Sequence, residues 1–428
     1  MFGLITLEKY SMDPLSMKHI RILRSFLSTT GAWPADYLGG KLTFMNKFFR
    51  KEIPCQAFIF GLGVVNCIVQ RSSVLDFITL GDLYITCFLS LITMLSISIL
   101  RSLLPNFKRY GELSKIFLLS FHLNNFKFKG GIYKEMHDRS EKFSYYFTIF
   151  MLVMMLIGCS LYNISPLYRN YKNGAFNKEI RDSKNITYQF SVFYVLPGFD
   201  PEDHFFFTTG FNVYISWTCA IAICAVDLFL CLMVFQIIAH SKILKYNLEH
   251  LFDEEVIKRC TIDDQAVVKL GLHENDAINI KLKECVDHHR LIVRFAGDMS
   301  EFYGPLLAIN YMFHLVCCCL LLLECTDLAA LIRFAPLTLI IFGQLTIISI
   351  TFEVVDTESQ KLPDAVYSVP WELMDVRNQR TVCIILHRVQ EPIRVTALGL
   401  TAVGVKHLFT FSYKVFNSGI TIPTENII

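Results

Sequence analysis

The sequence predicts an all-α membrane protein with seven transmembrane helices, and three observations support this fold class. Hydrophobic residues make up 53% of the 428 residues and charged residues only 18%, with a mean hydropathy of +0.43, whereas soluble domains carry about 25% charged residues. Seven apolar stretches approach or exceed the ~20 residues that a spanning helix needs. Lysine and arginine are also concentrated in alternate connections between these stretches.

The seven predicted spans are separated by charged and turn-forming segments. Residues 1–53 precede the first span, residues 353–395 separate the sixth from the seventh, and residues 396–428 contain the last helix and the C-terminus. The N-terminal segment has no long apolar core, so we expect an internal helix rather than a cleavable signal peptide to direct insertion. The spans are expected at residues 54–70, 77–100, 143–162, 210–238, 291–323, 330–352 and 396–420.

The charges of the connections predict the orientation. One set of alternate connections holds 28 lysine and arginine residues and the other set holds 7. Since cytosolic loops carry the excess of positive charge, the N-terminus is predicted to be cytosolic and the C-terminus extracellular. Both N-glycosylation sequons, at Asn163 and Asn185, fall in the 163–209 loop on the predicted extracellular side.

The fourth and fifth helices are predicted to be longer than the membrane is thick. Helical periodicity continues through residues 239–290, and a helix of about 45 residues would be about 68 Å long, against about 30 Å of hydrocarbon. The excess should project into the cytosol, where the amphipathic stretch 371–393 would pack against it. We expect the resulting cytosolic helical bundle to carry subunit contacts, with Ile385 and Leu386 among the contact residues.

Several side chains in the apolar and projecting segments could suggest special chemistry. His288 and His289, with Cys285 one turn away, could hold a metal, but a solvated helix face is the favoured interpretation and no metal site is expected. Asp227 lies deep in the fourth span, where a buried helix contact is favoured over a functional carboxylate. Most of the 14 cysteines lie in apolar runs and are expected to be buried thiols without a disulfide framework.

The last predicted span carries an unusual polar stripe. Five polar side chains recur at spacings of three or four and therefore share one helix face. A charge that faces lipid is costly, so this face should meet either water in a pore or a neighbouring helix. Both interpretations stay open on spacing alone. The five residues are Lys406, Thr410, Lys414, Asn417 and Thr421.

Seven spans are typical of G-protein-coupled receptors, but the sequence argues against that class. The predicted N-terminus is on the wrong side of the membrane, and the 163–209 loop contains no cysteine for the usual disulfide. The third span is followed by NISPLYRN rather than Asp-Arg-Tyr, and the last span lacks Asn-Pro-x-x-Tyr.

The C-terminal third of the chain resembles the signature of insect odorant receptors. The stretch from SQKLPDAVYSVPWELMDVRNQR to the last helix keeps that family's order of residues, and GAWP at 31–34 resembles its Gly-x-Trp-Pro. The sequence departs from the family where the usual Ser-Tyr-Ser reads Val415-Phe416-Asn417. The matching positions are Ser359, Ala365, Tyr367, Trp371, Arg377, Arg380, Arg388, Gln390, Pro392, Ala397, Gly399 and Leu400.

The resemblance implies an odorant-gated, non-selective cation channel in the plasma membrane of olfactory neurons. The chain would be a ligand-binding subunit in a hetero-tetramer with the olfactory co-receptor, because residues 239–290 lack that protein's long insertion. Membrane lipid and a small, mostly apolar odorant would be its other partners. The resemblance implies no nucleic-acid partner, no cofactor and no enzyme activity. A gustatory-type receptor and, less favoured, a multipass transporter are the alternatives.

The same design indicates where an odorant and the gate would lie. An apolar constriction near the extracellular end of the last helix would be formed by Phe416 and Ile420, with Asn417 in contact with permeating water. Ordinary packing of these side chains is an open alternative. The odorant site is expected among aromatic, methionine and small side chains in the outer halves of spans two, three, four and six, where core packing is again the alternative. The candidates are Tyr84, Phe88, Met154, Met155, Gly158, Phe211, Tyr214, Ile215, Thr218 and Phe342.

Overall fold

The fold is known from a computed structural model of residues 1–428. It describes most of the chain apart from the first two predicted spans and the last helix. The described residues are 14–38, 103–184, 186–191, 202–252, 269–323, 328–397 and 401–402.

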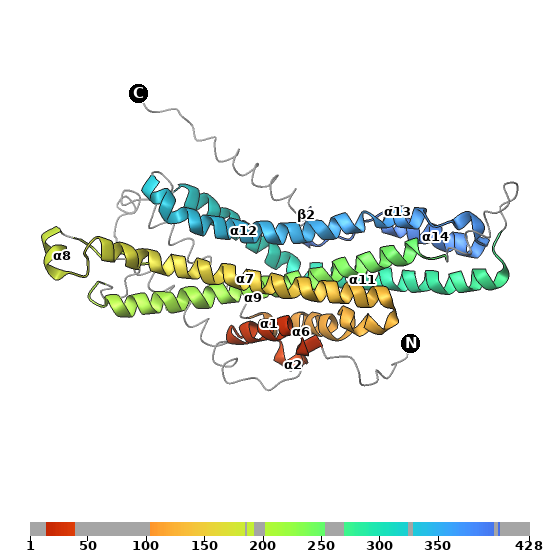
Figure 1. The fold of residues 1–428 in the computed structure, drawn as a ribbon, viewed down its shortest axis with the longest axis horizontal. Coiled ribbons are helices and arrows are strands. Elements are labelled where there is room, and N and C mark those ends of the chain that lie inside the picture. Colours follow the sequence, from red (N-terminus) through yellow and green to blue (C-terminus); the bar gives the residue numbers. More distant parts are fainter. Residues whose placement is uncertain are drawn as a thin grey trace, which may run out of the picture.

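Long helices that run side by side form the body of the molecule (Figure 1). They are α7 (Gly131–Lys172), α9 (Phe205–Glu249), α11 (Leu272–Leu323) and α12 (Leu328–Ser359). The short helix α8 (Lys178–Lys184) marks one end of this bundle, here called the α8 end, and the opposite end carries α14. The 52 residues of α11 would span about 78 Å, which confirms the prediction that helices exceed the bilayer in length.

Side-chain contacts show that α7 and α9 are antiparallel over most of their lengths. Near the α8 end, the Cys159 thiol lies 3.9 Å from the backbone oxygen of Ser216. Further along, Gln236 Nε2 donates to Ser140 Oγ at 3.2 Å. The partner on α7 thus moves toward its N-terminus as α9 proceeds. This pairing places both helices in one continuous bundle that includes the predicted membrane zone and its extension.

The α14 end is closed by short helices that follow α12. These are α13 (Leu362–Tyr367), the 3₁₀ helix η5 (Trp371–Leu373) and α14 (Val376–Val389). Asp375 caps α14, because its carboxylate accepts the Asn378 N–H at 2.9 Å. Asn378 in turn donates to the backbone oxygen of Asn275 on α11 at 2.8 Å. The helix is therefore attached to α11 by buried amide groups at its first turn.

The apolar face of α14 corrects one predicted contact. Val382, Ile385 and Val389 are buried within this chain, and their spacing of three and four places them on one helix face. Ile385 is therefore part of the core rather than a subunit contact, and Leu386 is half-buried against the same core. The neighbouring Ile384 is 64% exposed. The sequence pattern alone does not reveal which apolar face of this helix is covered.

The N-terminal residues pack on the side of α7 and α9. Helix α1 (Lys18–Thr29) is followed two residues later by Gly31, whose φ of 71° is a left-handed conformation that glycine adopts readily. The turn buries Trp33 beside α6 (Lys108–Ile116), where the Tyr110 hydroxyl donates to the backbone oxygen of Ala32 at 3.0 Å. The GAWP motif thus positions the N-terminal segment against the bundle. The helix α2 (Ala35–Leu38) follows.

Short irregular helices connect α6 to α7. Between them lie a π-helical turn, η3 (Phe117–Phe121), and a 3₁₀ helix, η4 (Leu123–Lys129). Two further short helices are η1 (Pro14–Ser16), which precedes α1, and η2 (Leu104–Asn106), which precedes α6. The rings of Phe121 and Phe295 stack with centroids 4.0 Å apart, which anchors η3 to α11.

The predicted boundaries of two spans are wrong. The third span was expected to end at residue 162, but α7 continues for ten more residues and contains Pro166 in its interior. The last helix was expected to begin at residue 396. Instead, β1 (Thr396–Ala397) pairs antiparallel with β2 (Thr401–Ala402). A hydropathy pattern indicates which residues can lie in the membrane. The ends of a helix depend instead on local backbone hydrogen bonds, which hydropathy does not reveal.

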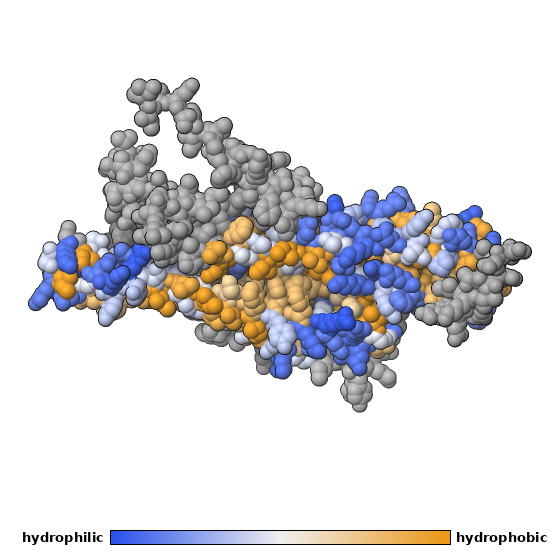
Figure 2. Space-filling view, turned by 45° about the horizontal axis from the view of Figure 1, so that its top comes forward, coloured by the Kyte–Doolittle hydropathy of each residue, from blue (hydrophilic) through white to orange (hydrophobic). Residues whose placement is uncertain are grey.

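An apolar band crosses the middle of the face shown in Figure 2, with hydrophilic surfaces toward both ends. Three described stretches are long and apolar enough to cross a membrane: Gly131–Lys172, Phe205–Glu249 and Leu339–Leu373. On α7, Tyr146 and Tyr168 are both exposed, and their separation of 22 positions corresponds to about 33 Å. Tyrosine is enriched at membrane interfaces, so these two rings match the edges of a bilayer. The exposed apolar side chains between them are Ile149, Phe150, Val153, Leu156, Ile157, Leu161 and Ile164.

Candidate ligand-binding site

Helices α7, α9 and α12 approach closely in the half of the apolar zone nearest the α8 end. The Cβ atom of an alanine in place of Gly158 on α7 would lie 3.2 Å from Ile340 Cδ1 on α12. On the α9 side, Cys159 contacts Ser216. A single turn of α7 therefore faces both other helices, and the absence of a side chain at Gly158 permits this approach.

The candidate ligand residues on described helices divide by burial. Met155 and Gly158 are buried, and Gly158 lies at the contact with α12 described above. Met154, Phe211 and Thr218 are half-buried. This set supplies flexible apolar and aromatic surface on α7 and α9, which suits an apolar ligand.

Two other candidates are more open. The side chain of Tyr214 is 37% exposed and that of Phe342 is 42% exposed. Ile215 belongs to α9, but its side chain lies outside the described part, as do Tyr84 and Phe88. The structure thus places Gly158 at the contact between α7 and α12, and a ligand-binding role for all ten candidates stays a prediction.

Asn163 is a residue of this region that the sequence analysis assigned to glycosylation. It lies inside α7 with 5% of its surface exposed, and its amide donates to the backbone oxygen of Cys159 and to Ser216 Oγ, each at 2.8 Å. Its amide oxygen accepts from Ser191 Oγ at 3.3 Å. A buried amide that already joins three segments is not available to a glycosyltransferase. The glycosylation prediction for Asn163 is therefore wrong, whereas Asn185 lies outside the described residues.

A strap of extended chain, residues 186–191, covers the α8 end of α7. The backbone N–H of Gln189 donates to the Asn170 amide oxygen at 2.8 Å, and the Asn170 amide donates back to the Gln189 carbonyl at the same distance. The Tyr162 hydroxyl donates to the Ser191 carbonyl at 2.9 Å. Together with Asn163, these bonds hold the strap beside the turn that contains Gly158.

Aromatic side chains join the strap to the start of α9. The rings of Tyr188 and Phe205 stack with centroids 4.4 Å apart, and Phe176 meets Phe205 edge to face at 5.5 Å. Phe190 also lies 5.3 Å from Phe205. The α8 end of the site is thus closed by aromatic surface, which is compatible with entry or binding of an apolar volatile.

A group of buried polar side chains lies deeper in the bundle. The Tyr311 hydroxyl of α11 and Ser349 Oγ of α12 are 2.7 Å apart. Asp227 of α9 is 2% exposed. Asp227 and Ser349 lie on α9 and α12, which also bear ligand candidates, and Tyr311 lies on α11, which packs against both helices. Asp227 is thus buried, whereas the helix contact expected for it stays a prediction.

His288 is half-buried and hydrogen-bonded within the bundle, which corrects the prediction that it lies on a solvated helix face. His240 and His288 form a hydrogen bond of 2.8 Å between Nδ1 and Nε2, and His240 Nε2 donates to the Phe121 carbonyl at 2.7 Å. Burial lowers the pKa of His240 to about 4, so the ring is neutral at pH 7. Its single proton lies on Nε2, because the Phe121 carbonyl can only accept, and Nδ1 therefore accepts from His288 Nε2. The pKa of His288 is well below its usual value, mainly because the ring is buried and to a smaller extent because His240 is close. The pair is therefore neutral and structural.

One turn of α7 also brings possible metal ligands together. His137, Asp138 and Glu141 offer ligand atoms within 4.8 Å of one another. The His137 ring is buried, but both carboxylates are partly exposed, and Asp138 also pairs with Lys127 at 3.8 Å. These contacts account for the three side chains without an ion.

The predicted gate lies outside the described residues. Phe416, Asn417 and Ile420, and the polar stripe from Lys406 to Thr421, belong to the part of the chain for which no placement is given. Their pore assignment stays a prediction.

Comparisons with known proteins agree with this architecture. A putative odorant receptor 85d from Drosophila melanogaster is 22% identical over 223 residues, which cover 49% of this chain and 50% of that protein. Odorant receptor 10 from Aedes albopictus is 23% identical over 130 residues, covering 30% and 35%. The chain thus aligns with half or less of the length of these curated relatives.

Solved structures match over nearly the whole chain. The insect olfactory receptor OR5 from Machilis hrabei superposes with a TM-score of 0.65 at 15% identity, covering 96% of this chain and 98% of that one. The same receptor in complex with eugenol gives a TM-score of 0.62 at 16% identity, with coverage of 97% and 100%. At these identities the likeness shows a shared fold.

The sequence itself carries the family assignment. The model of the 7tm odorant receptor family matches residues 76–412, which is most of the chain and includes α7, α9, α11, α12 and α14. The chain belongs to the 7tm odorant receptor family.

Proposed function

We propose that this chain is the ligand-binding subunit of an odorant-gated, non-selective cation channel that it forms with the olfactory co-receptor. The supporting observation is the junction of α7, α9 and α12, where Met155 and Gly158 present buried apolar surface beside the polar group of Asn163. Pockets for small ligands combine mostly apolar lining with a few polar groups. A related receptor of the same fold has been solved with eugenol, so small aromatic volatiles are the first ligands to test.

The α8 end faces the outside of the cell in this proposal, and the α14 end lies in the cytosol. The excess of lysine and arginine at the α14 end supports that orientation. An odorant would then reach the junction from the extracellular side, past the strap. Lipid would cover the exposed apolar face of α7 between Tyr146 and Tyr168.

Subunits would meet through the cytosolic bundle. Apolar side chains remain exposed there after the chain has folded, and they include Ile384 and Val376 on α14 and Ile280 on α11. Exposed apolar patches rimmed by polar residues are typical of protein interfaces. The co-receptor is the partner proposed for this surface, and the last helix of each subunit would line a central pore with Phe416, Asn417 and Ile420 at its gate.

Recording odorant-evoked currents in a heterologous cell tests this function. Cells that express this chain together with the co-receptor should give cation currents that reverse near zero millivolts, with a ligand profile absent from cells that express the co-receptor alone. Cells with this chain alone should give little current. A transporter would move ligand without the co-receptor and with strict ion coupling, and such a result would refute the proposal.

A further inference from the structure

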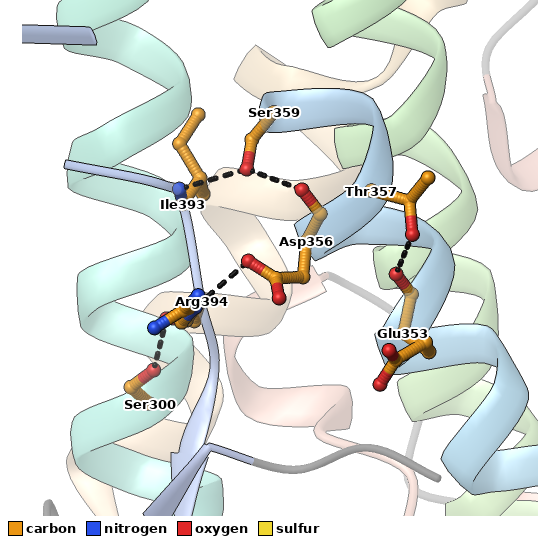
Figure 3. Close-up of polar contacts among 7 residues, drawn as sticks. All are labelled: Ser300, Glu353, Asp356, Thr357, Ser359, Ile393 and Arg394. Atoms are coloured by element: carbon orange, nitrogen blue, oxygen red, sulfur yellow. Dashed lines mark hydrogen bonds and ion pairs between the residues drawn. The ribbon is translucent and has the colours of Figure 1, made fainter. Parts of the chain in front are cut away.

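The segment that leads into the last helix is attached to α11 and α12 by a compact set of polar contacts (Figure 3). Arg394 Nε donates to Asp356 Oδ1 on α12 at 2.7 Å. The backbone N–H of Ile393 donates to Ser359 Oγ at 3.1 Å, one turn further along the same helix. Ser359 Oγ itself donates to the Asp356 carbonyl at 2.9 Å. Two successive residues of the connecting segment thus bind two positions on one face of α12.

The opposite side of the segment is bound to α11. Ser300 Oγ donates to the Arg394 carbonyl at 3.5 Å and accepts the backbone N–H of Thr396 at 3.2 Å. Ile393 and Val395 are buried on either side of Arg394. The segment is therefore held between two helices by both its backbone and its alternating side chains.

Asp356 belongs to the same continuous helix as the ligand-site residue Ile340. Helix α12 runs without interruption from Leu328 to Ser359, and the 16 residues between positions 340 and 356 correspond to about 24 Å. A rigid helix that joins two sites can transmit a displacement between them. A shift at the Gly158–Ile340 contact would consequently move the Asp356 carboxylate, which holds the chain entering the last helix.

We propose that Asp356 and Arg394, with Ser300 and Ser359, form a latch that couples ligand binding at α12 to the last helix. This inference rests on the proposed channel function. Asp356 and Arg394 are positioning residues, because they touch neither the ligand nor the ions. Their side chains are 21% and 44% exposed, and partly exposed ion pairs contribute little to overall stability. Their position, which joins α12 to the connecting segment, therefore points to coupling rather than to folding.

The test measures odorant-gated current in the complex with the co-receptor. Asp356→Asn and Arg394→Gln should each raise the half-maximal odorant concentration about 5-fold or more, the lower range of allosteric coupling. The double variant Asp356→Arg/Arg394→Asp restores opposite charges and should recover most of the wild-type value. Surface expression and melting temperature are measured in parallel, because a structural role alone would change those quantities instead.

A neighbouring ion pair provides the matched control. Lys361 Nζ and Glu358 Oε1 lie 2.9 Å apart near the end of α12 and do not bind the connecting segment. Glu358→Gln should leave the odorant response unchanged. If a latch variant fails to reach the surface, Arg394→Lys and Ser300→Ala remove geometry without removing charge, and they should still shift the response.

The possible outcomes separate the latch from the channel itself. A wild-type complex without odorant-gated current overturns the proposed function and the latch with it. A wild-type current with unchanged odorant sensitivity in the single variants overturns the latch alone. The same conclusion follows if the charge reversal fails to recover sensitivity, or if Glu358→Gln shifts it equally.

Discussion

At the scale of single residues, Asn163 shows how a motif can acquire another role through folding. The sequon Asn163-Ile-Ser165 is complete in the sequence, yet the amide is buried between α7, α9 and the strap. Nothing adjacent in the sequence reveals this, because Ser216 and Ser191 are distant along the chain. Hydrogen-bond partners of this kind become visible only in three dimensions.

Two substitutions within this sequon should separate its possible roles. Asn163→Gln removes a buried hydrogen-bonding group and should destabilise the protein by about 1–3 kcal/mol, with a weaker odorant response. Ser165→Ala abolishes the sequon but keeps the amide, and it should behave as wild type. Thermal unfolding and gel mobility, both in an Asn185→Gln background, measure the two effects. Glycan loss in Ser165→Ala would contradict the assignment.

Gly158 gives a second prediction at this scale. The added methyl group of Gly158→Ala would press on Ile340, with an expected cost of about 1–3 kcal/mol for overpacking. The consequence should be a lower odorant sensitivity, because α7 and α12 separate at the candidate site. Ile340→Val removes a methyl group from the opposing side chain. The double variant should therefore recover sensitivity, and its failure to do so would place the effect of Gly158 elsewhere.

At the scale of elements, α14 presents two neighbouring isoleucines with opposite environments. Ile384 is 64% exposed and Ile385 only 6% exposed. Ile384→Asp should leave the subunit folded but reduce its co-purification with the co-receptor. Ile385→Asp buries a charge and should lower expression of the chain itself. Co-purification normalised to subunit amount distinguishes the two, and equal normalised binding for Ile384→Asp and wild type would argue against this interface.

Buried histidines should make the α14 half of the bundle sensitive to acid. The pKa of His19 is lowered from 6.5 to about 4, mainly because the ring is buried and to a smaller extent because His137 is close. Burial also lowers the pKa of His122. Below pH 6.5 the unfolded chain binds protons that the folded chain does not, so stability should fall as the pH decreases toward 4. Each histidine contributes up to about 1.4 kcal/mol per pH unit. Above pH 6.5 this contribution is constant.

Thermal unfolding between pH 7.5 and 5 measures this effect before most carboxylates titrate. His19→Gln should give a shallower dependence of melting temperature on pH than wild type. A flat wild-type profile, or an unchanged slope in the variant, would show that these histidines are protonated in the folded state.

The sequence predicted these helices well where a long apolar periodicity defines them. It predicted them less well where polar contacts between distant residues determine where a helix ends. The extensions of α9 and α11 beyond the membrane followed from uninterrupted periodicity, and both are present. The end of α7 was missed because Asn163 and Pro166 suggested a turn, whereas buried contacts of Asn163 and Asn170 continue the helix. The neutral pair of His240 and His288 depends on two helices that are joined only after folding.

At the scale of the whole molecule, the arrangement separates three tasks along one axis. In the proposed function, the α8 end holds the ligand candidates, the apolar band lies in the bilayer, and the α14 end exposes apolar side chains for assembly. Helix α12 connects the first and third regions without interruption. This organisation explains how a small molecule at one end could change the chain that enters the last helix. The ligand candidates on α7 and α9 come from the sequence and stay a prediction, whereas the latch could be proposed only from the fold.

In the proposed function, this chain together with the co-receptor is itself the odorant-gated channel. Recording from excised outside-out patches in nucleotide-free solution tests this proposal most directly. We expect odorant to open a cation current in such patches, and Gly158→Ala to shift its concentration dependence without changing its reversal potential. A current that disappears on excision, or that returns only with added GTP, would refute the proposed channel.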